Sequence, residues 1–170
     1  AIRILSEIGM SDAPKELCDL ILDHGGKLEN NRLLYPTNLI ESTIGRHQRV
    51  ILLAGQTADN DLQVGKNYVY AGTGGAAPNL QNSKTKQYAP SKLKDLYDAA
   101  RLADKLPNVS FFSRSLVAGD IENPLDFDLS TAAASLAVTS KNVMFQAAQF
   151  THEKAIEELC YKIEGGEDNL

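Results

Sequence analysis

A regular alternation of short apolar segments and helical segments, in the second half of the chain, most constrains the fold. Val109 and Val143 lie at the centres of two apolar, β-prone segments, and each segment is followed by a helical pattern, over residues 124–139 and 151–163. The two valines are 34 residues apart, which is the length of one strand–helix unit of a parallel sheet. The pattern predicts an α/β fold with helices covering a parallel sheet, either doubly wound or the start of a (β/α)8 TIM barrel.

The first part of the chain has a different pattern. Short helical stripes end at Gly9, begin again at Pro14 and begin a third time at Pro36, and an Asn30-Asn31 pair between alternating apolar residues predicts a hairpin. The segments RVILLAG and NYVYAG then read as strands. We therefore expect a helical N-terminal region with short strands over residues 1–65, and the first strand–helix units of an incomplete TIM barrel over residues 66–170. A whole barrel needs about 250 residues, so the chain is expected to be a fragment of one.

Composition excludes several classes of function. The net charge is −5, and the 17 Lys and Arg residues are scattered, so a nucleic-acid partner is not expected. No apolar run approaches the roughly 20 residues of a membrane-spanning helix, and the cytoplasm is the expected location. Cys18 and Cys160 each lie on an apolar helical stripe and are expected to be buried, reduced thiols. The three histidines do not group with other ligand residues, and no metal site is predicted.

The glycine-rich segment YVYAGTGGAAPN, residues 68–79, allows three interpretations. Gly72, Gly74 and Ala77 match the G-x-G-x-x-A spacing of a dinucleotide-binding turn, but Pro78 and a polar stretch follow where that turn requires a helix. The glycines can instead serve a simple chain reversal. In the third interpretation they let a ligand approach the backbone at the carboxyl end of a barrel strand, where the active sites of such barrels lie.

Several segments in the same order resemble the trimethylamine methyltransferase family. They are GTGGAAPN (72–79), LKDLYDAARLADKLPNVSFFSRSLVAGD (93–120) and DLSTAAASLAVTSKNV (128–143), preceded by AIRILSEIGM and HGGKLENNRLLYP. The resemblance covers nearly the whole chain, which corresponds to about the N-terminal third of the family's proteins. It implies a (β/α)8 barrel that moves a methyl group from a tertiary or quaternary amine, trimethylamine or one like glycine betaine, to the cobalt of a cognate corrinoid protein. The cobalamin would then be carried by that partner, with no cofactor bound directly.

A methylated ammonium ion needs aromatic faces and polar groups around it, because it has no proton to donate. Loop residues that follow predicted strands, with one tyrosine on a helix, supply the candidates for substrate binding: Thr73, Gly74, Gly75, Asn79, Tyr97, Arg114 and Gln146. Arg114 can pair with a substrate carboxylate or form a structural ion pair with Asp98 or Asp120. Asp120, Asp126 and Asp128 read as acids at a helix start.

Some questions stay open at this stage. No catalytic residue can be assigned, and the chain alone is expected to be inactive. The sequence does not decide which amine is used, whether pyrrolysine is present, or whether a homo-oligomer forms. The rival hypotheses are a nucleotide-dependent oxidoreductase that uses the GTGGAA turn and a non-enzymatic structural fragment. A nucleotide site would require a helix that begins directly after Ala77.

Overall fold

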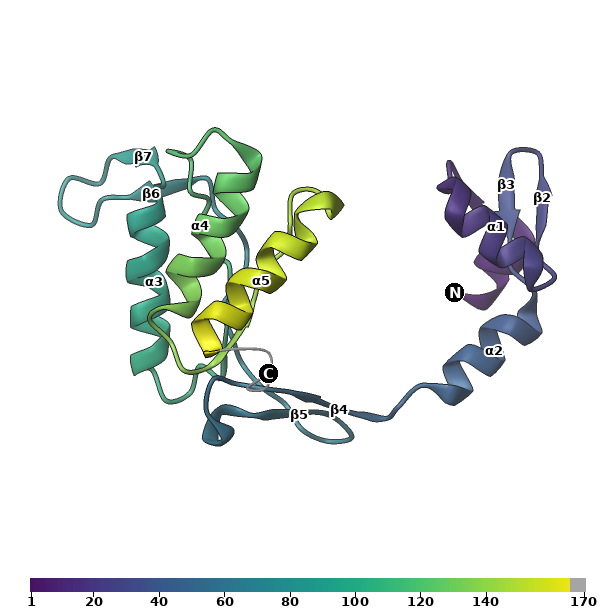
Figure 1. Ribbon diagram of the computed structural model, residues 1–170, viewed down its shortest axis with the longest axis horizontal. Helices are drawn as coiled ribbons and strands as arrows, with labels where there is room; N and C mark the ends of the chain where they lie inside the picture. The colour runs from purple at the N-terminus through teal and green to yellow at the C-terminus, as the bar shows by residue number, and fades with distance from the viewer. Residues whose placement is uncertain (166–170) are drawn as a thin grey trace. The chain divides into compact units, whose positions relative to one another are not determined.

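A computed structural model of the chain describes residues 1–165, which form parts of two compact units, Ala1–Arg49 and Val50–Leu170 (Figure 1). The sequence predicts a division after residue 65. In the structure the first strand pair after residue 49 belongs to the second unit. No helix within the described residues is both long and apolar enough to cross a membrane.

The first unit combines short helices with a three-stranded antiparallel sheet. Its elements are a π-helical turn (Ile4–Ile8), β1 (Met10–Ser11), α1 (Lys15–Asp23), β2 (Lys27–Glu29), β3 (Arg32–Leu34) and α2 (Thr37–Arg46). The strand order is β1-β3-β2, and Leu33 of the central strand is completely buried. The predicted hairpin is confirmed: Asn30 and Asn31 form its turn with φ of 50° and 59°, the left-handed geometry that such two-residue turns require.

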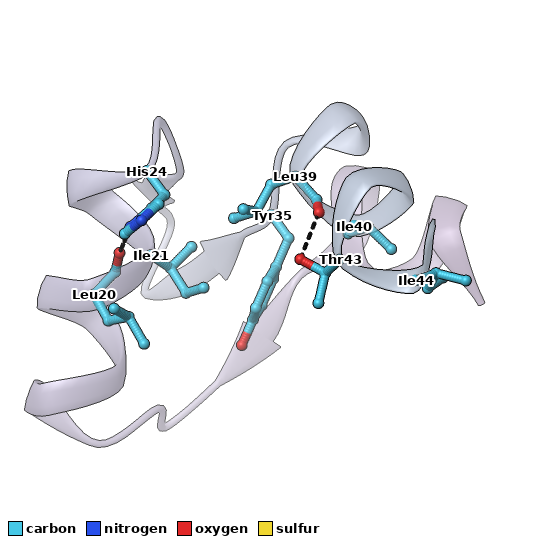
Figure 2. A pocket seen from close by; sticks show the side chains of 8 residues that line it. All are labelled: Leu20, Ile21, His24, Tyr35, Leu39, Ile40, Thr43 and Ile44. Atoms are coloured by element: carbon cyan, nitrogen blue, oxygen red, sulfur yellow. Dashed lines mark hydrogen bonds between the residues drawn. The ribbon is translucent and has the colours of Figure 1, made fainter. Parts of the chain in front are cut away.

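An apolar groove lies in this unit between α1 and α2 (Figure 2). It has a volume of about 390 Å³, and leucine and isoleucine side chains dominate its lining. Two of its polar side chains bond to carbonyl oxygens one helical turn before them: Nδ1 of His24 lies 2.8 Å from the Leu20 carbonyl oxygen, and Oγ1 of Thr43 donates to the Leu39 carbonyl oxygen at 2.8 Å. The Tyr35 hydroxyl bonds to the Met10 sulfur. The groove therefore offers an apolar surface with few polar groups free to orient a ligand.

The second unit carries the predicted strand–helix alternation. Its elements are β4 (Val50–Leu53), a 3-10 turn (Ala58–Asn60), β5 (Leu62–Gly65), β6 (Asn79–Gln81), β7 (Tyr88–Pro90), α3 (Leu93–Lys105), β8 (Phe111–Ser113), α4 (Pro124–Leu136), β9 (Asn142–Met144), a 3-10 turn (Phe150–His152) and α5 (Glu153–Glu164). The two strands β8 and β9 pair in parallel, with Phe112 opposite Val143. The α/β class is thus confirmed, and the closed (β/α)8 barrel stays a prediction.

The segment that follows β5 lies beside β8 without forming a full strand. The sequence predicts a strand over NYVYAG, but the structure has only two isolated parallel bridges, Gly72 with Phe111 and Ala77 with Leu116. Val69 is 92% exposed and so contributes little to packing. The parallel layer consequently runs from this bridged segment through β8 to β9.

The core of the second unit forms where α3 covers β8. The apolar face of α3 buries Leu96, Ala100 and Ala103 against Phe112, which is completely buried. Burying a phenylalanine side chain contributes about 1.5–3 kcal/mol, so this contact fixes which side of β8 faces the helices. Phe111, the preceding residue, points to the opposite side because side chains alternate along a strand.

Helix α4 begins as the sequence predicts. The Asn123 side chain accepts hydrogen bonds from the amides of Leu125 and Asp126 at 2.9 and 3.1 Å, and Pro124 occupies the first helical position. Such a cap contributes about 1 kcal/mol. Helix α4 packs between α3 and α5 (Figure 1), and α3 contacts β8.

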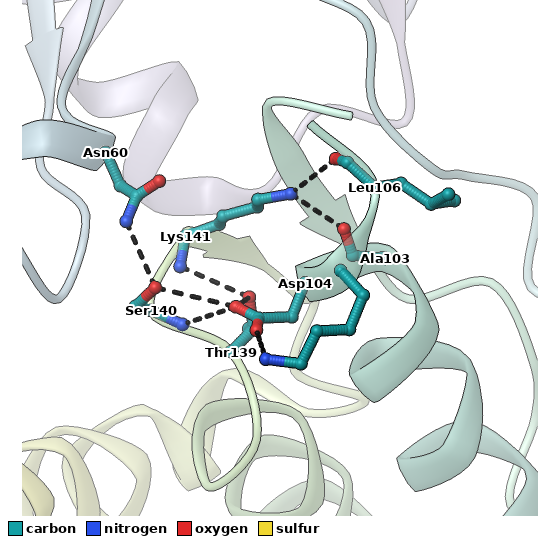
Figure 3. Close-up of polar contacts among 8 residues, drawn as sticks. Asn60, Ala103, Asp104, Leu106, Thr139, Ser140 and Lys141 are labelled. Carbon is teal, nitrogen blue, oxygen red and sulfur yellow. Dashed lines mark hydrogen bonds and ion pairs between the residues drawn. The ribbon is translucent and has the colours of Figure 1, made fainter. Parts of the chain in front are cut away.

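A cluster of polar contacts ties the end of α3 to the start of β9 (Figure 3). Asp104 accepts hydrogen bonds from the Thr139 hydroxyl and the Ser140 amide, both at 3.1 Å. The ammonium group of Lys141 donates to the carbonyl oxygens of Ala103 and Leu106 at 2.7 and 2.8 Å. These carbonyls lie at the C-terminus of α3, where a positive charge is favourable, and each also accepts one backbone amide, from Leu106 and Val109 respectively.

The charges in this cluster shift the pKa of Asp104. Partial burial raises the pKa of its carboxyl, but hydrogen bonds from Lys105, Ser140 and Thr139 lower it by more, so the net pKa lies below the ordinary value. The ionised form is therefore favoured in the folded chain.

Two antiparallel strand pairs were not foreseen as pairs. The strand β4, which the sequence does predict, pairs with β5, and the loop between them is bonded to the start of β9: the Gln56 amide donates to the Ser140 carbonyl oxygen at 2.9 Å. The strands β6 and β7 form a hairpin in which every residue is exposed. The polar stretch after the glycine-rich segment is therefore folded back on itself.

Candidate functional site

A hollow at the carboxyl ends of the parallel strands is the best candidate for a functional site. Its volume is about 320 Å³, at the lower end of the range for small-molecule pockets. It is lined by residues that follow or end each of three neighbouring segments: Gly75, Ala76, Ser113, Arg114, Met144, Phe145 and Gln146. Parallel strands bring their carboxyl ends to one edge, and in α/β folds that edge is where ligands bind.

Backbone bonds hold the three segments in register around this hollow. The Ala76 amide donates to the Arg114 carbonyl oxygen at 3.2 Å, and the Arg114 amide donates to the Met144 carbonyl oxygen at 3.1 Å. Arg114 is therefore bonded on both sides at the point where its side chain leaves the sheet. Its backbone position is well determined by the fold.

The three glycines of the segment have different structural settings. A Cβ on Gly72 would lie 2.3 Å from Cε2 of Phe111, so the ring of Phe111 requires a glycine there. Gly75 has φ of +116°, which disfavours every other residue. Gly74 has neither requirement, since a Cβ there would meet no atom within 4 Å. Two of the glycines thus have packing or backbone reasons that do not involve a ligand.

The requirement for a nucleotide-binding turn is not met. The residue after the last position of the G-x-G-x-x-A pattern is Pro78, and β6 begins at Asn79. Ala77 itself is bridged to Leu116, in an extended arrangement beside β8. Without a helix N-terminus facing the loop, the backbone dipoles that bind a pyrophosphate are missing.

Arg114 lies half-buried at the wall of the hollow. Its guanidinium carbon lies 5.4 Å from the centre of the Phe127 ring, within the range of a cation–π contact. The structural ion pairs considered from the sequence are not formed: Asp98 pairs with Lys94 at 2.5 Å, and Asp120 accepts the Leu93 amide at 2.8 Å. Within the described residues, no carboxylate forms an ion pair with Arg114. The guanidinium has donors available to an anion.

The segment after β9 forms another wall of the hollow. It contributes Phe145, which is half-buried, and Gln146, which is exposed. The Asp128 carboxylate holds its far end, because Oδ2 accepts the Ala148 amide at 2.8 Å and lies 2.7 Å from Nδ1 of His152. Asp128 is therefore more than an acid at a helix start: it contacts the loop that leads to α5.

The structure brings together three of the predicted substrate-binding residues, Gly75, Arg114 and Gln146. The others, Thr73, Gly74, Asn79 and Tyr97, do not line this hollow. The Thr73 hydroxyl donates to the Ser113 carbonyl oxygen at 2.6 Å and accepts the Ser113 amide at 2.9 Å, so its polar atoms are used in the sheet.

Asn79 begins β6 and is exposed, and Tyr97 lies on α3 with 37% of its surface exposed. Sequence reasoning missed Phe145 as the aromatic residue of the hollow. Its position directly after an apolar strand and beside Gln146 was the available signal.

Metal ligands, cysteines and groups with shifted pKa values do not point to a second site in the described part of the chain. Residues 1–165 contain no group of three or more His, Cys, Asp or Glu side chains placed to hold a metal ion. Cys18 and Cys160, expected to be buried, are both half-buried. The remaining groups with shifted pKa values are surface residues: the partner Asp19 raises the pKa of Lys15, and the Lys94–Asp98 pair raises the pKa of Lys94 and lowers that of Asp98.

Comparison with known proteins identifies the family. The family model described as "Trimethylamine methyltransferase (MTTB)" matches residues 1–169. A curated relative, Trimethylamine methyltransferase MttB of Desulfitobacterium hafniense (strain DSM 10664 / DCB-2), is 22% identical over 171 residues. That match covers 99% of this chain and 34% of the relative, so the chain spans about a third of the relative's length. The chain belongs to the trimethylamine methyltransferase family.

Proposed function

We propose that this member of the trimethylamine methyltransferase family contributes part of the substrate site of an amine:corrinoid methyltransferase. In this proposal a methyl group passes from a tertiary or quaternary amine to the cobalt of a separate corrinoid protein, which brings the cobalamin with it. The whole activity requires family segments beyond the third that this chain spans, so the chain alone is expected to be inactive. Its contribution is to bind and orient the amine.

A quaternary amine that carries a carboxylate, of the glycine-betaine type, is the substrate class we favour. The observation that carries this choice is Arg114, which lines the hollow from a fixed backbone position and has no carboxylate partner within residues 1–165. A guanidinium bonds a carboxylate through two parallel N–H donors, and such charge-assisted bonds are about twice as strong as neutral ones. Trimethylamine has no carboxylate and would gain nothing from it.

The other wall of the hollow suits the methylated end of such a substrate. The Phe145 ring can face the trimethylammonium group, a contact of about 2 kcal/mol at a desolvated site. Ser113 and Gln146 add polar groups without adding charge. Because the methyl acceptor must approach in line, the substrate needs to be held at both ends, and a carboxylate clamp opposite an aromatic face provides this.

Binding of glycine betaine to the full-length protein tests the substrate proposal directly. In a calorimetric or NMR titration, Arg114→Gln is expected to weaken glycine betaine binding by about 10- to 100-fold, which corresponds to one or two charge-assisted hydrogen bonds. Binding of trimethylamine is expected to change little. Arg101→Gln is the matched control, since Arg101 is an exposed arginine that lies 3.9 Å from Asp98 on the surface of α3. Equal loss in both variants would contradict the assignment.

The methyl transfer itself is tested on the full-length protein. Demethylation of the amine is expected only when a methyl-accepting corrinoid protein is supplied. Demethylation without any corrinoid would overturn the proposal. A chain that binds no methylated amine, within a full-length protein that transfers no methyl group, would favour the structural-fragment hypothesis.

A further inference from the structure

The carboxylate of Asp128 is the most deeply buried acid near the candidate site. Its side chain, on the second turn of α4, is 1% exposed. Both of its contacts run to the loop after β9: the Ala148 amide and the His152 imidazole converge on Oδ2, at 2.8 and 2.7 Å. The other oxygen, Oδ1, has no hydrogen-bond partner among the described residues. Both hydrogen-bond partners of the buried Asp128 carboxylate therefore lie in the segment that connects β9 to α5.

This loop is a wall of the hollow. Ala148 is two residues after Gln146 and three after Phe145, and all three follow directly from β9. Gln146 and Ala148 are exposed, so apolar burial does little to hold them. A hydrogen bond from a backbone amide to a buried carboxylate is stronger than one between two neutral groups, and it can select one loop conformation over others.

The same turn of α4 also contacts Arg114, another residue that lines the hollow. Phe127, the neighbour of Asp128, places its ring against the Arg114 guanidinium. One helical turn thus contacts the side chain that would bind the carboxylate and the loop that would face the ammonium group. The distance between these two walls depends on that turn.

We propose that Asp128 is a positioning residue, which holds the segment after β9 so that Phe145 and Gln146 face Arg114 across the hollow. The positional part of this inference stands on the contacts of Asp128 alone. Its consequence for amine binding rests on the proposed function.

Three variants separate positioning from general stability. Asp128→Ala removes the acceptor from both the Ala148 amide and His152. Asp128→Asn keeps an acceptor oxygen and places an NH2 group where Oδ1 has no partner, so it is expected to lose stability but keep the loop. Asp104→Ala is the matched control, because it removes a partly buried acid that holds the start of β9, the strand whose end Asp128 secures.

Hydrogen exchange of the Ala148 amide is the first measurement. Ala148 is exposed, so its amide is expected to exchange about tenfold faster, or more, in Asp128→Ala once the hydrogen bond is lost. In Asp128→Asn and Asp104→Ala the exchange is expected to stay within about threefold of the unmodified chain. Unchanged exchange in Asp128→Ala, or an equal increase in Asp104→Ala, would overturn the inference.

Titration with glycine betaine is the second measurement. Asp128→Ala is expected to weaken binding by about tenfold, while Asp128→Asn restores it and Asp104→Ala leaves it unchanged. If the unmodified full-length protein binds no glycine betaine, the proposed function fails and the exchange result still decides the positional role. If binding is present and Asp128→Ala leaves it intact, the positioning inference fails and the proposed function stands.

Discussion

Replacing Gly72 by alanine tests whether this glycine exists to make room for the Phe111 ring. The added Cβ would lie 2.3 Å from Cε2 and 2.4 Å from Cδ2 and Cζ of that ring, whereas carbon atoms pack at about 3.5–4.0 Å. The ring or the backbone must therefore move by more than 1 Å, roughly, and overpacking of this kind costs about 1–3 kcal/mol. Alanine also restricts the unfolded chain, which returns about 0.4–1 kcal/mol. We expect a net loss of about 1–2 kcal/mol in the free energy of unfolding.

Urea unfolding followed by far-ultraviolet circular dichroism measures this loss. Gly74→Ala is the control, because its Cβ would meet no atom within 4 Å and its φ is not positive. It is expected to be neutral or to stabilise by up to about 1 kcal/mol. Phe111→Leu should recover at least about 1 kcal/mol of the Gly72→Ala loss in a double-mutant cycle, since a smaller side chain leaves space for the Cβ. Equal effects at Gly72 and Gly74, or additive effects in the cycle, would refute the packing explanation.

Two further predictions concern the contacts between α3 and β9. Asp104→Asn is expected to lower stability at pH 7 by about 1–2 kcal/mol; because the pKa of Asp104 is lowered in the folded chain, this contribution is complete above about pH 4 and is lost as the pH falls further. Unfolding at pH 7 and pH 3 checks it, and a difference between variant and parent that does not shrink in acid would contradict it. Lys141→Met is expected to cost about 2–3 kcal/mol, because it removes the charged donor from the carbonyl oxygens of Ala103 and Leu106, each of which then keeps only one backbone amide donor. Thermal unfolding beside the exposed control Lys154→Met measures this, and equal stability of the two variants would show that the contact is not needed.

The elements that the sequence predicts well are those with a local cause. The hairpin at Asn30 and Asn31 follows from residues that accept positive φ, and α4 starts where Asn123 and Pro124 form a cap. The face of α3 follows from its apolar spacing, which the buried Leu96 and Ala100 confirm.

The elements that the sequence does not predict depend on contacts with residues far away in the chain. The exposed hairpin β6–β7 has no apolar alternation to announce it, because neither of its faces is buried. The segment that ends at Gly72 looks like a strand, yet its one bridge within the described residues is that of Gly72 itself with Phe111. Whether an apolar run pairs depends on the neighbour that it meets, and that information is not local.

The residues of the candidate site also fall into those that the sequence could predict and those that depend on contacts far along the chain. Arg114 and Gln146 could be placed at the hollow because the carboxyl ends of parallel strands meet at one edge. Asn79 begins the exposed strand β6 and does not line the hollow, and its role in substrate binding stays a prediction. The contact between Asp128 and the loop after β9 joins residues about twenty positions apart, and no spacing rule points to it.

The two acids that secure β9 have a mechanical consequence. The strand has only three residues, and its ladder to β8 is equally short, so backbone pairing alone would offer little resistance to force along the chain. Asp104 fastens the residues that enter the strand, and Asp128 fastens those that leave it. Under tension, β9 should therefore yield only after one of these two side-chain anchors has broken, and the weaker anchor would decide from which end the strand peels away.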